Sequence, residues 1–113
     1  MSTHHQIFIV NNEASSGNLE LSDRGKDTFV SGRDKVSWHI HPQSGVSSIR
    51  IQKKASSPEI FSSPPHQQGA IWRGDVTSEP APFTEWVYSI FWKANGSNTE
   101  FEFDPKITIR PSI

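Results

Sequence analysis

Residues 84–110 read TEWVYSIFWKANGSNTEFEFDPKITIR, and this stretch decides the fold class. Two β-rich runs flank Asn95-Gly96, a dipeptide that favours the tight turn of a hairpin. In the second run the large apolar residues all fall on odd positions: Phe101, Phe103, Ile107 and Ile109. Side chains of a strand alternate between its two faces, so these residues share one face. The stretch therefore predicts a long β-hairpin with a buried side.

The first arm of this hairpin is apolar on both sides. One side carries Trp86, Tyr88, Ile90 and Trp92, and the other carries Val87 and Phe91. Such a strand is typical of the centre of a sheet, so we expect the heart of the core here. Pro105 interrupts the second arm and has no amide to donate. The strand is therefore either at a sheet edge there or broken by a bulge that bends it from one sheet to another, and we favour the bend.

The rest of the chain contains short β-rich runs separated by Gly, Pro and Asn, with no convincing helical periodicity. Seven or eight strands at intervals of roughly 8–12 residues are typical of a sandwich. We therefore expect an all-β, antiparallel two-sheet sandwich, cupredoxin-like or immunoglobulin-like, forming a single domain over residues 1–113. Gly32-Arg33-Asp34 reads as a turn, and Ser78-Glu79-Pro80-Ala81-Pro82 as a stiff connector.

Residues 53–69 read KKASSPEIFSSPPHQQG and differ in composition from the runs around them. Paired serines and prolines predominate, and only Ile60 and Phe61 can anchor the segment. We interpret it as a long surface loop, a feature that is often either functional or simply mobile.

Composition excludes several classes of function. The 113 residues contain no cysteine, which rules out disulfides, thiolate metal sites and iron–sulfur clusters. A net charge of -1 offers no basic stripe, so we expect neither a nucleic-acid nor a membrane partner. Neither a long apolar run nor a signal-like start is visible, and we expect a cytoplasmic protein.

Several of these segments together resemble a known family. The early Ile-rich strand, Gly32-Arg33-Asp34, the strand Lys35-Val36-Ser37-Trp38-His39 and the closing Phe103-Asp104-Pro105-Lys106-Ile107-Thr108-Ile109 are similar to cupredoxin-like sandwich domains of bacteria. The last strand is also similar to that of bacterial inclusion-body-type sandwich proteins. The resemblance implies the scaffold without its copper, because blue-copper members use a cysteine and usually a methionine. Here Cys is absent and Met1 is the sole methionine.

Histidines offer one candidate site. In the run 35–41, alternation turns Val36, Trp38 and Ile40 inward and Ser37, His39 and His41 outward. His39 and His41 would then share a face, with His66 as a third ligand for zinc or copper. A solvated polar face explains the same pattern, so both interpretations stay open and no cofactor is required.

Trp72 offers a second candidate site. Trp38, Trp86 and Trp92 occupy the apolar phase of their strands, whereas Trp72 lies beside the Pro-rich segment. A flat indole near amides and a carboxylate can stack on a sugar ring, which makes a set of candidate glycan contacts: Trp72, Gln67, Gln68 and Asp75. The alternative is a partly exposed indole whose NH simply has a partner.

Catalytic motifs are missing from the sequence. No serine lies in a Gly-x-Ser-x-Gly turn, and neither phosphate-loop nor dinucleotide glycine motifs occur. We therefore expect a non-enzymatic binding or assembly module whose partner is another protein or a second copy of itself. A carbohydrate-binding, lectin-like domain is the first alternative, and a histidine-based metal-binding protein is the second.

Overall fold

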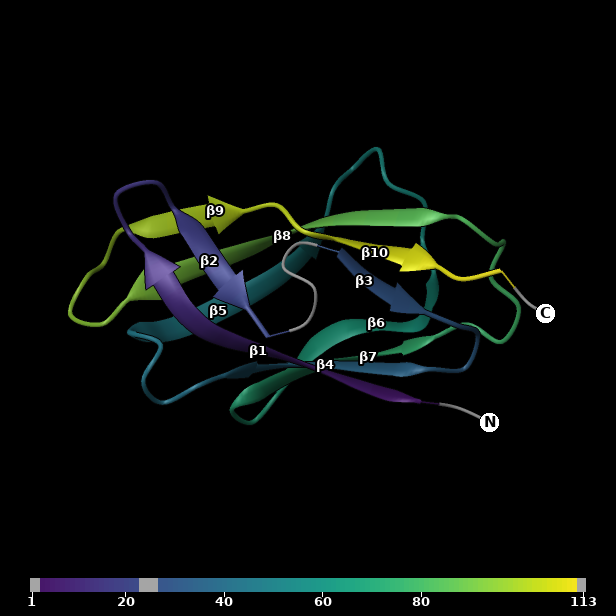
Figure 1. The fold of residues 1–113 in the computed structure, drawn as a ribbon, viewed down its shortest axis with the longest axis horizontal. Coiled ribbons are helices and arrows are strands. Elements are labelled where there is room, and N and C mark those ends of the chain that lie inside the picture. Colours follow the sequence, from purple (N-terminus) through teal and green to yellow (C-terminus); the bar gives the residue numbers. More distant parts are fainter. Residues whose placement is uncertain (1–2, 23–26, 112–113) are drawn as a thin grey trace.

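The computed structural model describes residues 3–22 and 27–111, and within them ten strands form two facing sheets (Figure 1). The all-β sandwich is thus confirmed, with more strands than expected. None of the described residues belongs to a helix that could cross a membrane. The strands are β1 (His4–Glu13), β2 (Asn18–Leu21), β3 (Asp27–Val30), β4 (Lys35–Ile40), β5 (Val46–Lys53), β6 (Phe61–Gln68), β7 (Ile71–Val76), β8 (Glu85–Ala94), β9 (Glu100–Phe103) and β10 (Lys106–Ile109).

The sheets mix parallel and antiparallel pairs. One sheet has the order β2-β1-β4-β7-β6, and the other has the order β3-β10-β8-β5 with β9 also paired to β8. β1 runs parallel to β4, and β3 runs parallel to β10. The prediction of a purely antiparallel sandwich is therefore wrong for these two strand pairs. Alternation reveals which face of a strand is buried, but it carries no information about strand direction.

The core lies between the sheets and is built on β8. Trp86, Tyr88, Ile90 and Trp92 are at most 1% exposed, as the pattern of the first hairpin arm predicts. Trp38 of β4 faces them from the other sheet and donates its indole N–H to the Tyr88 hydroxyl at 3.2 Å. Burying each such large side chain contributes roughly 1.5–3 kcal/mol to stability, so β8 is the main source of cohesion.

Pro105 breaks the closing strand as expected, but the strand does not change sheets. β9 pairs with β8 over 90–93 and β10 pairs with β8 over 85–87. Both lie on the edge of β8 opposite β5. The break lets β10 also pair with β3 while the chain stays in one sheet.

The expected loop over 53–69 is a strand in its second half. β6 pairs with β7 at the edge of its sheet, with register shifts between Phe61 and Ser63 and between Ser63 and His66. An edge strand leaves one row of backbone groups unpaired, so Pro64 and Pro65 fit there without costing a ladder hydrogen bond. The two prolines and the bulges hide this strand from pattern reading.

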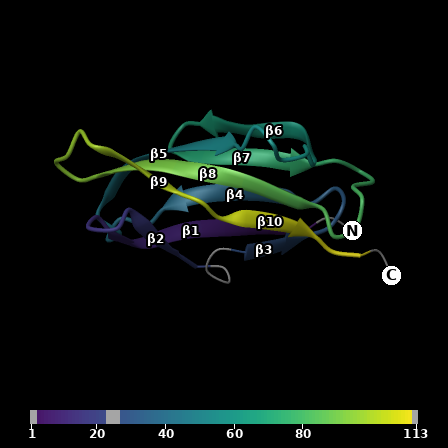
Figure 2. The same ribbon diagram turned by 90° about the horizontal axis from the view of Figure 1, so that it is seen from above.

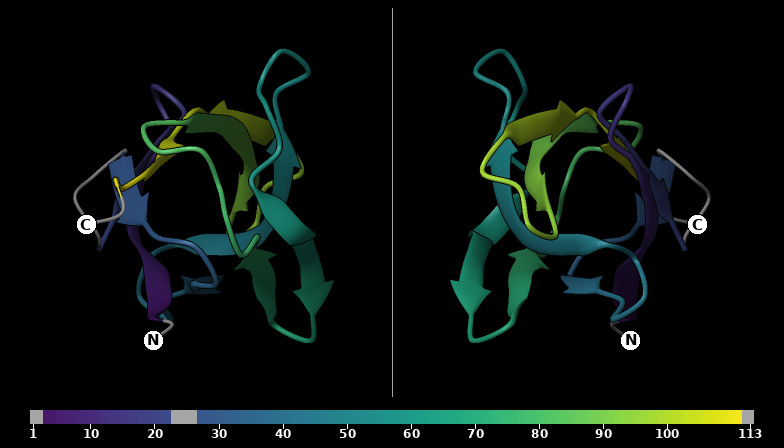
Figure 3. Two further views of the ribbon diagram at one scale, coloured as in Figure 1. Left: turned by 90° about the vertical axis from the view of Figure 1, so that its right-hand side faces the viewer. Right: turned by 90° about the vertical axis from the view of Figure 1, so that its left-hand side faces the viewer.

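The two ends of the molecule differ in their connections. The sandwich measures 45 × 26 × 22 Å. The β3–β4 and β7–β8 connections lie at one end of the long axis, and the β1–β2 and β8–β9 turns lie at the other (Figures 1 and 2). Figure 3 looks along this axis from each end in turn. We call the first end, formed by residues 31–35, 77–84 and 110, the loop end.

Candidate functional site

Phe83 stands out at the loop end. Its side chain is 70% exposed, and it is the large apolar residue that the described part of the chain leaves in solvent. Its φ is 64°, a left-handed conformation that is unusual for any residue but glycine and rarer still for a bulky one. Phe83 therefore combines an exposed ring with a strained backbone.

Hydrogen bonds hold Phe83 in this conformation. Its amide donates to the carbonyl oxygen of Ile109 at 2.8 Å. The neighbouring Thr84 donates to the carbonyl oxygen of Ala81 twice, from its amide at 3.3 Å and from its hydroxyl at 2.7 Å. Pro80 and Pro82 restrict the approach to Phe83, because proline fixes φ near −65°. The ring is thus displayed on a stiff loop.

Arg33 is the second strained residue. Among the described residues other than glycine, only Arg33 and Phe83 have positive φ, and the value for Arg33 is 68°. Its amide donates to the carbonyl oxygen of Thr77 at 3.0 Å, which ties the β3–β4 turn to the β7–β8 loop. Strained backbone conformations cost free energy and persist only where the surrounding contacts fix them, and they are found most often at binding and active sites. Both strained residues lie in adjoining loops at one end.

Asp34 anchors the turn that carries Arg33. The residue is 3% exposed, and its carboxylate accepts hydrogen bonds from the amides of Thr3 and Ser31 at 2.9 and 2.8 Å. His5 approaches the same carboxylate at 2.8 Å through Nε2. Charge-assisted hydrogen bonds of this kind are stronger than neutral ones. The turn is consequently fastened to β1.

Charge at the loop end is mainly positive. Arg33, Lys35 and Arg110 are exposed there, and the Arg110 guanidinium lies 5.9 Å from the Phe29 ring. Glu79 is an exposed carboxylate of the same loop, whereas Glu85 pairs with Lys106 at 2.7 Å. The loop end therefore carries three exposed cations in addition to the exposed ring of Phe83.

The expected histidine site is not assembled. His39 lies on β4 and His66 on β6, with β7 between them. His41 follows the end of β4, where its Nδ1 accepts from the Gln43 amide at 3.1 Å. His66 makes local contacts with Pro64 and Gln68. No group of three His, Cys, Asp or Glu side chains among residues 3–22 and 27–111 is arranged to hold a metal ion.

A different histidine pair is present. His4 and His39 each place Nε2 2.8 Å from the Ser37 hydroxyl, and His39 stacks on Phe8 with ring centroids 4.7 Å apart. Ser37, expected to face solvent, is fully buried under these rings. Burial lowers the pKa of His39, and the nearby His4 lowers it further. The two rings together cover the hydroxyl of Ser37.

Trp72 of β7 is partly buried and packs against the core. It lies opposite Trp38, and its indole N–H donates to the Ile49 carbonyl oxygen of the other sheet at 3.1 Å. A groove of about 290 Å³ runs beside it, lined also by Ile40, Gln67 and Ala70. Gln67 lies opposite Trp72 in the β6–β7 ladder, so these two predicted contacts do meet.

The other two predicted glycan contacts lie elsewhere. Gln68 lies one position from Gln67 and opposite Ile71, and Asp75 lies three positions from Trp72. These odd spacings place both side chains on the opposite face of the sheet. Asp75 interacts there with Arg73 at 3.9 Å. The expected cluster of four is therefore divided between two faces, because neighbouring residues in a strand point in opposite directions.

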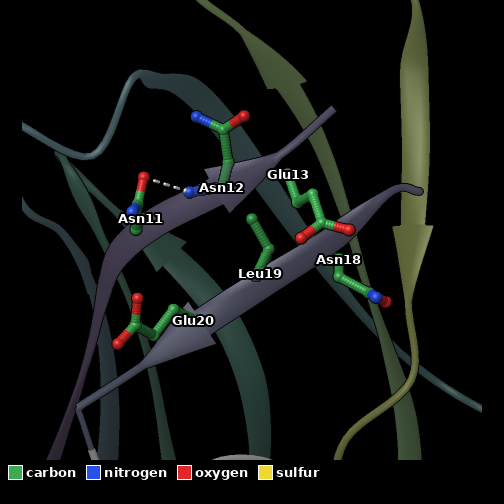
Figure 4. Close-up of a pocket in the computed structure, with 6 residues that line it drawn as sticks. All are labelled: Asn11, Asn12, Glu13, Asn18, Leu19 and Glu20. Carbon is green, nitrogen blue, oxygen red and sulfur yellow. Dashed lines mark hydrogen bonds between the residues drawn. The ribbon is translucent and has the colours of Figure 1, made fainter. Parts of the chain in front are cut away.

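A small groove occupies the other end of the molecule. It has a volume of about 140 Å³ and lies over the β1–β2 hairpin. Leu19 lies between the carboxylates of Glu13 and Glu20 in Figure 4. Three asparagines complete the lining, namely Asn11, Asn12 and Asn18. This surface, which we call the hairpin groove, is an apolar floor with an acidic rim.

Sequence reasoning missed both of these surfaces. The composition of Pro80-Ala81-Pro82 predicts a stiff connector, and it does not indicate that the following Phe83 is exposed. The positive φ values of Arg33 and Phe83 have no counterpart in the sequence, because both residue types normally adopt negative φ.

Comparison with known proteins gives no family assignment. No family model matches the sequence, and no curated protein matches it. Among solved structures, the chain is similar to the cysteine protease inhibitor EhICP2 from Entamoeba histolytica, with a TM-score of 0.44 and 8% sequence identity. The alignment covers 96% of this chain and 97% of that one.

Proposed function

We propose that this protein is a non-catalytic protein-binding module and that the loop end is its contact surface. The observation that carries the proposal is Phe83, which is 70% exposed in a left-handed conformation. Leaving an aromatic ring in water and straining its backbone both cost free energy. A partner that buries the ring would offset the cost of its exposure, so the ring is suited to binding.

The surroundings of Phe83 support this proposal. Aromatic and arginine side chains dominate the binding energy of protein interfaces, and Arg33 is displayed beside the loop of Phe83. Binding also costs entropy when loops must be ordered, and the bonds of Phe83 to Ile109 and of Thr84 to Ala81 order this loop in advance. The loop end is therefore preorganised for contact.

Site-specific crosslinking tests the proposal. A photoreactive phenylalanine analogue at position 83, introduced into the chain in its source cells, is expected to crosslink to a discrete protein. The same analogue at Ser56, an exposed position between β5 and β6, is the matched control. Crosslinking at Ser56 alone, or at neither position, would refute a contact surface at the loop end.

The Trp72 groove favours carbohydrate binding as a second candidate. Its volume of about 290 Å³ combines an indole with the Gln67 amide and the apolar side chains of Ile40 and Ile49. A glycan array probed with the wild-type chain and with a Gln67→Ala variant tests this role. Loss of specific spots in the variant supports it, whereas an array without any specific spot argues against it. Gln68→Ala, on the opposite face, is the control.

A further inference from the structure

We propose that the partner of the loop end is a second copy of this chain, whose hairpin groove receives Phe83. This inference rests on the proposed function and adds the identity of the partner. It follows from the match between two surfaces at opposite ends of one molecule. Each surface has a feature that the described structure leaves unused: an exposed ring at one end and an acid-rimmed groove at the other.

The hairpin groove has the size that a phenyl ring requires. Its volume is about 140 Å³, and a cavity of roughly 150 Å³ is known to hold a benzene molecule. Leu19, which is 7% exposed, provides apolar contact at the floor. The asparagine amides and the carboxylates leave the rim polar, as in the outer part of a protein interface. Phe83 can therefore enter while the rim stays hydrated.

Charge complements shape in this contact. Arg33, Lys35 and Arg110 are exposed at the loop end that carries Phe83, whereas Glu13 and Glu20 border the groove. None of the six described residues that line the groove is a cation. Glu13 accepts a hydrogen bond from the Ser16 hydroxyl at 2.6 Å, which fixes one carboxylate at the rim. Opposite charges across an interface set its orientation and speed encounter. The same charges disfavour contact between two loop ends or between two grooves.

The positions of the surfaces determine the kind of assembly. The loop end and the hairpin groove lie at opposite ends of the long axis (Figures 1 and 2). Contact between unlike surfaces is heterologous, and it produces a ring or an open chain of subunits rather than a symmetric dimer. The protein would therefore grow head to tail, with a free loop end and a free groove on every linear oligomer.

Two variants separate the surfaces. Phe83→Asp places a carboxylate in the acidic groove and disables the loop end, whereas Glu13→Lys with Glu20→Lys disables the groove. Analytical ultracentrifugation of the purified chain should show a mass that increases with concentration, and each variant alone should associate at least about tenfold more weakly. High salt should also weaken association, because exposed charges are screened beyond roughly 8–10 Å at physiological ionic strength.

Mixing the two variants is the decisive step. The groove of the Phe83→Asp chain and the loop end of the double-lysine chain remain intact, so an equimolar mixture should form heterodimers and stop there. Ser56→Asp adds the same charge at an exposed site outside both surfaces and should associate like wild type. Circular dichroism and urea unfolding of each variant confirm that it is folded.

The outcomes distinguish this inference from the proposed function. Oligomers of wild type and heterodimers in the mixture support head-to-tail assembly. A wild-type chain that stays monomeric at every concentration, or a mixture that stays monomeric, overturns it. If the analogue at position 83 then crosslinks to a different protein, the loop end is a binding surface for that protein. If it crosslinks to nothing, both proposals fail.

Discussion

The amide of Arg33 donates a 3.0 Å hydrogen bond to the carbonyl oxygen of Thr77, and this bond joins the two loops that carry the strained residues. Gly32 makes the contact possible. A Cβ atom at position 32 would lie 2.5 Å from the Ser78 carbonyl oxygen and 3.0 Å from Pro80. The loop end is therefore a packed unit in which the position of Phe83 depends on the turn before β4.

Gly32→Ala should loosen this unit. The added methyl group forces the backbone of Ser78 away, and overpacking of this kind costs about 1–3 kcal/mol. Urea unfolding measures the loss, and self-association should weaken with it. Ser31→Ala is the control, since Ser31 contributes its backbone amide to Asp34 and its side chain is not needed. A Gly32→Ala chain as stable as wild type would show that the two loops are not tightly packed.

Phe83→Asn should separate stability from binding. Asparagine adopts the left-handed conformation more easily than phenylalanine, so strain falls while the exposed ring is lost. We expect the free energy of unfolding to stay the same or rise by up to about 1 kcal/mol. Association measured by ultracentrifugation should fall. A clear decrease in stability would mean that Phe83 has a structural role that its exposure conceals.

The single substitution Asp34→Ala should destabilise the fold strongly. It leaves the amides of Thr3 and Ser31 without their acceptor and removes the partner of His5. A hydrogen bond to a charged group contributes about 1.5–3 kcal/mol, and denaturant unfolding can resolve its loss. Glu79→Ala removes an exposed carboxylate at the same end and should change stability by less than about 0.5 kcal/mol. Equal effects of the two substitutions would contradict the anchoring role of Asp34.

Because of His39, the free energy of unfolding should decrease as pH is lowered. Burial lowers its pKa below 6.5 in the folded protein, so the unfolded chain binds the proton more readily. The contribution of neutral His39 is present above pH 6.5 and is lost as pH falls through 6.5 toward the folded pKa. A His39→Gln variant should lose part of this dependence in urea unfolding followed across that range.

The effect of His4 on His39 can be measured directly. His4→Gln removes the charge that is the second cause of the lowered pKa, so NMR titration should show the pKa of His39 rising. It should remain below 6.5, because burial is the larger cause. A pKa of His39 unchanged by the substitution would mean that the two imidazoles are not coupled across Ser37.

Alternation and turn signals were sufficient to predict the core. Trp86, Tyr88, Ile90 and Trp92 are buried because a strand has only two faces, and a single apolar phase identifies the inner one. The Asn95-Gly96 turn and the break at Pro105 follow from the backbone preferences of those residues.

Features that depend on distant contacts could not be predicted in this way. β6 is a strand because β7 pairs with it, despite Pro64 and Pro65. The parallel pairs β1–β4 and β3–β10 depend on the path of the whole chain. The separation of His66 from His39 by β7, and the bulged register of β6 at His66, also depend on pairing between distant strands. The strain at Arg33 and Phe83 likewise results from packing between loops.

The most direct test of head-to-tail contact uses the absence of cysteine from the sequence. A single cysteine at Pro82 can carry a nitroxide spin label next to Phe83, and this labelled chain is mixed with unlabelled, ¹⁵N-enriched wild type. We predict paramagnetic broadening of amide signals at 11–13 and 18–20 of the enriched copy, the residues of the hairpin groove. Broadening confined to other residues, or none at concentrations where the chains associate, would contradict the insertion of Phe83 into that groove.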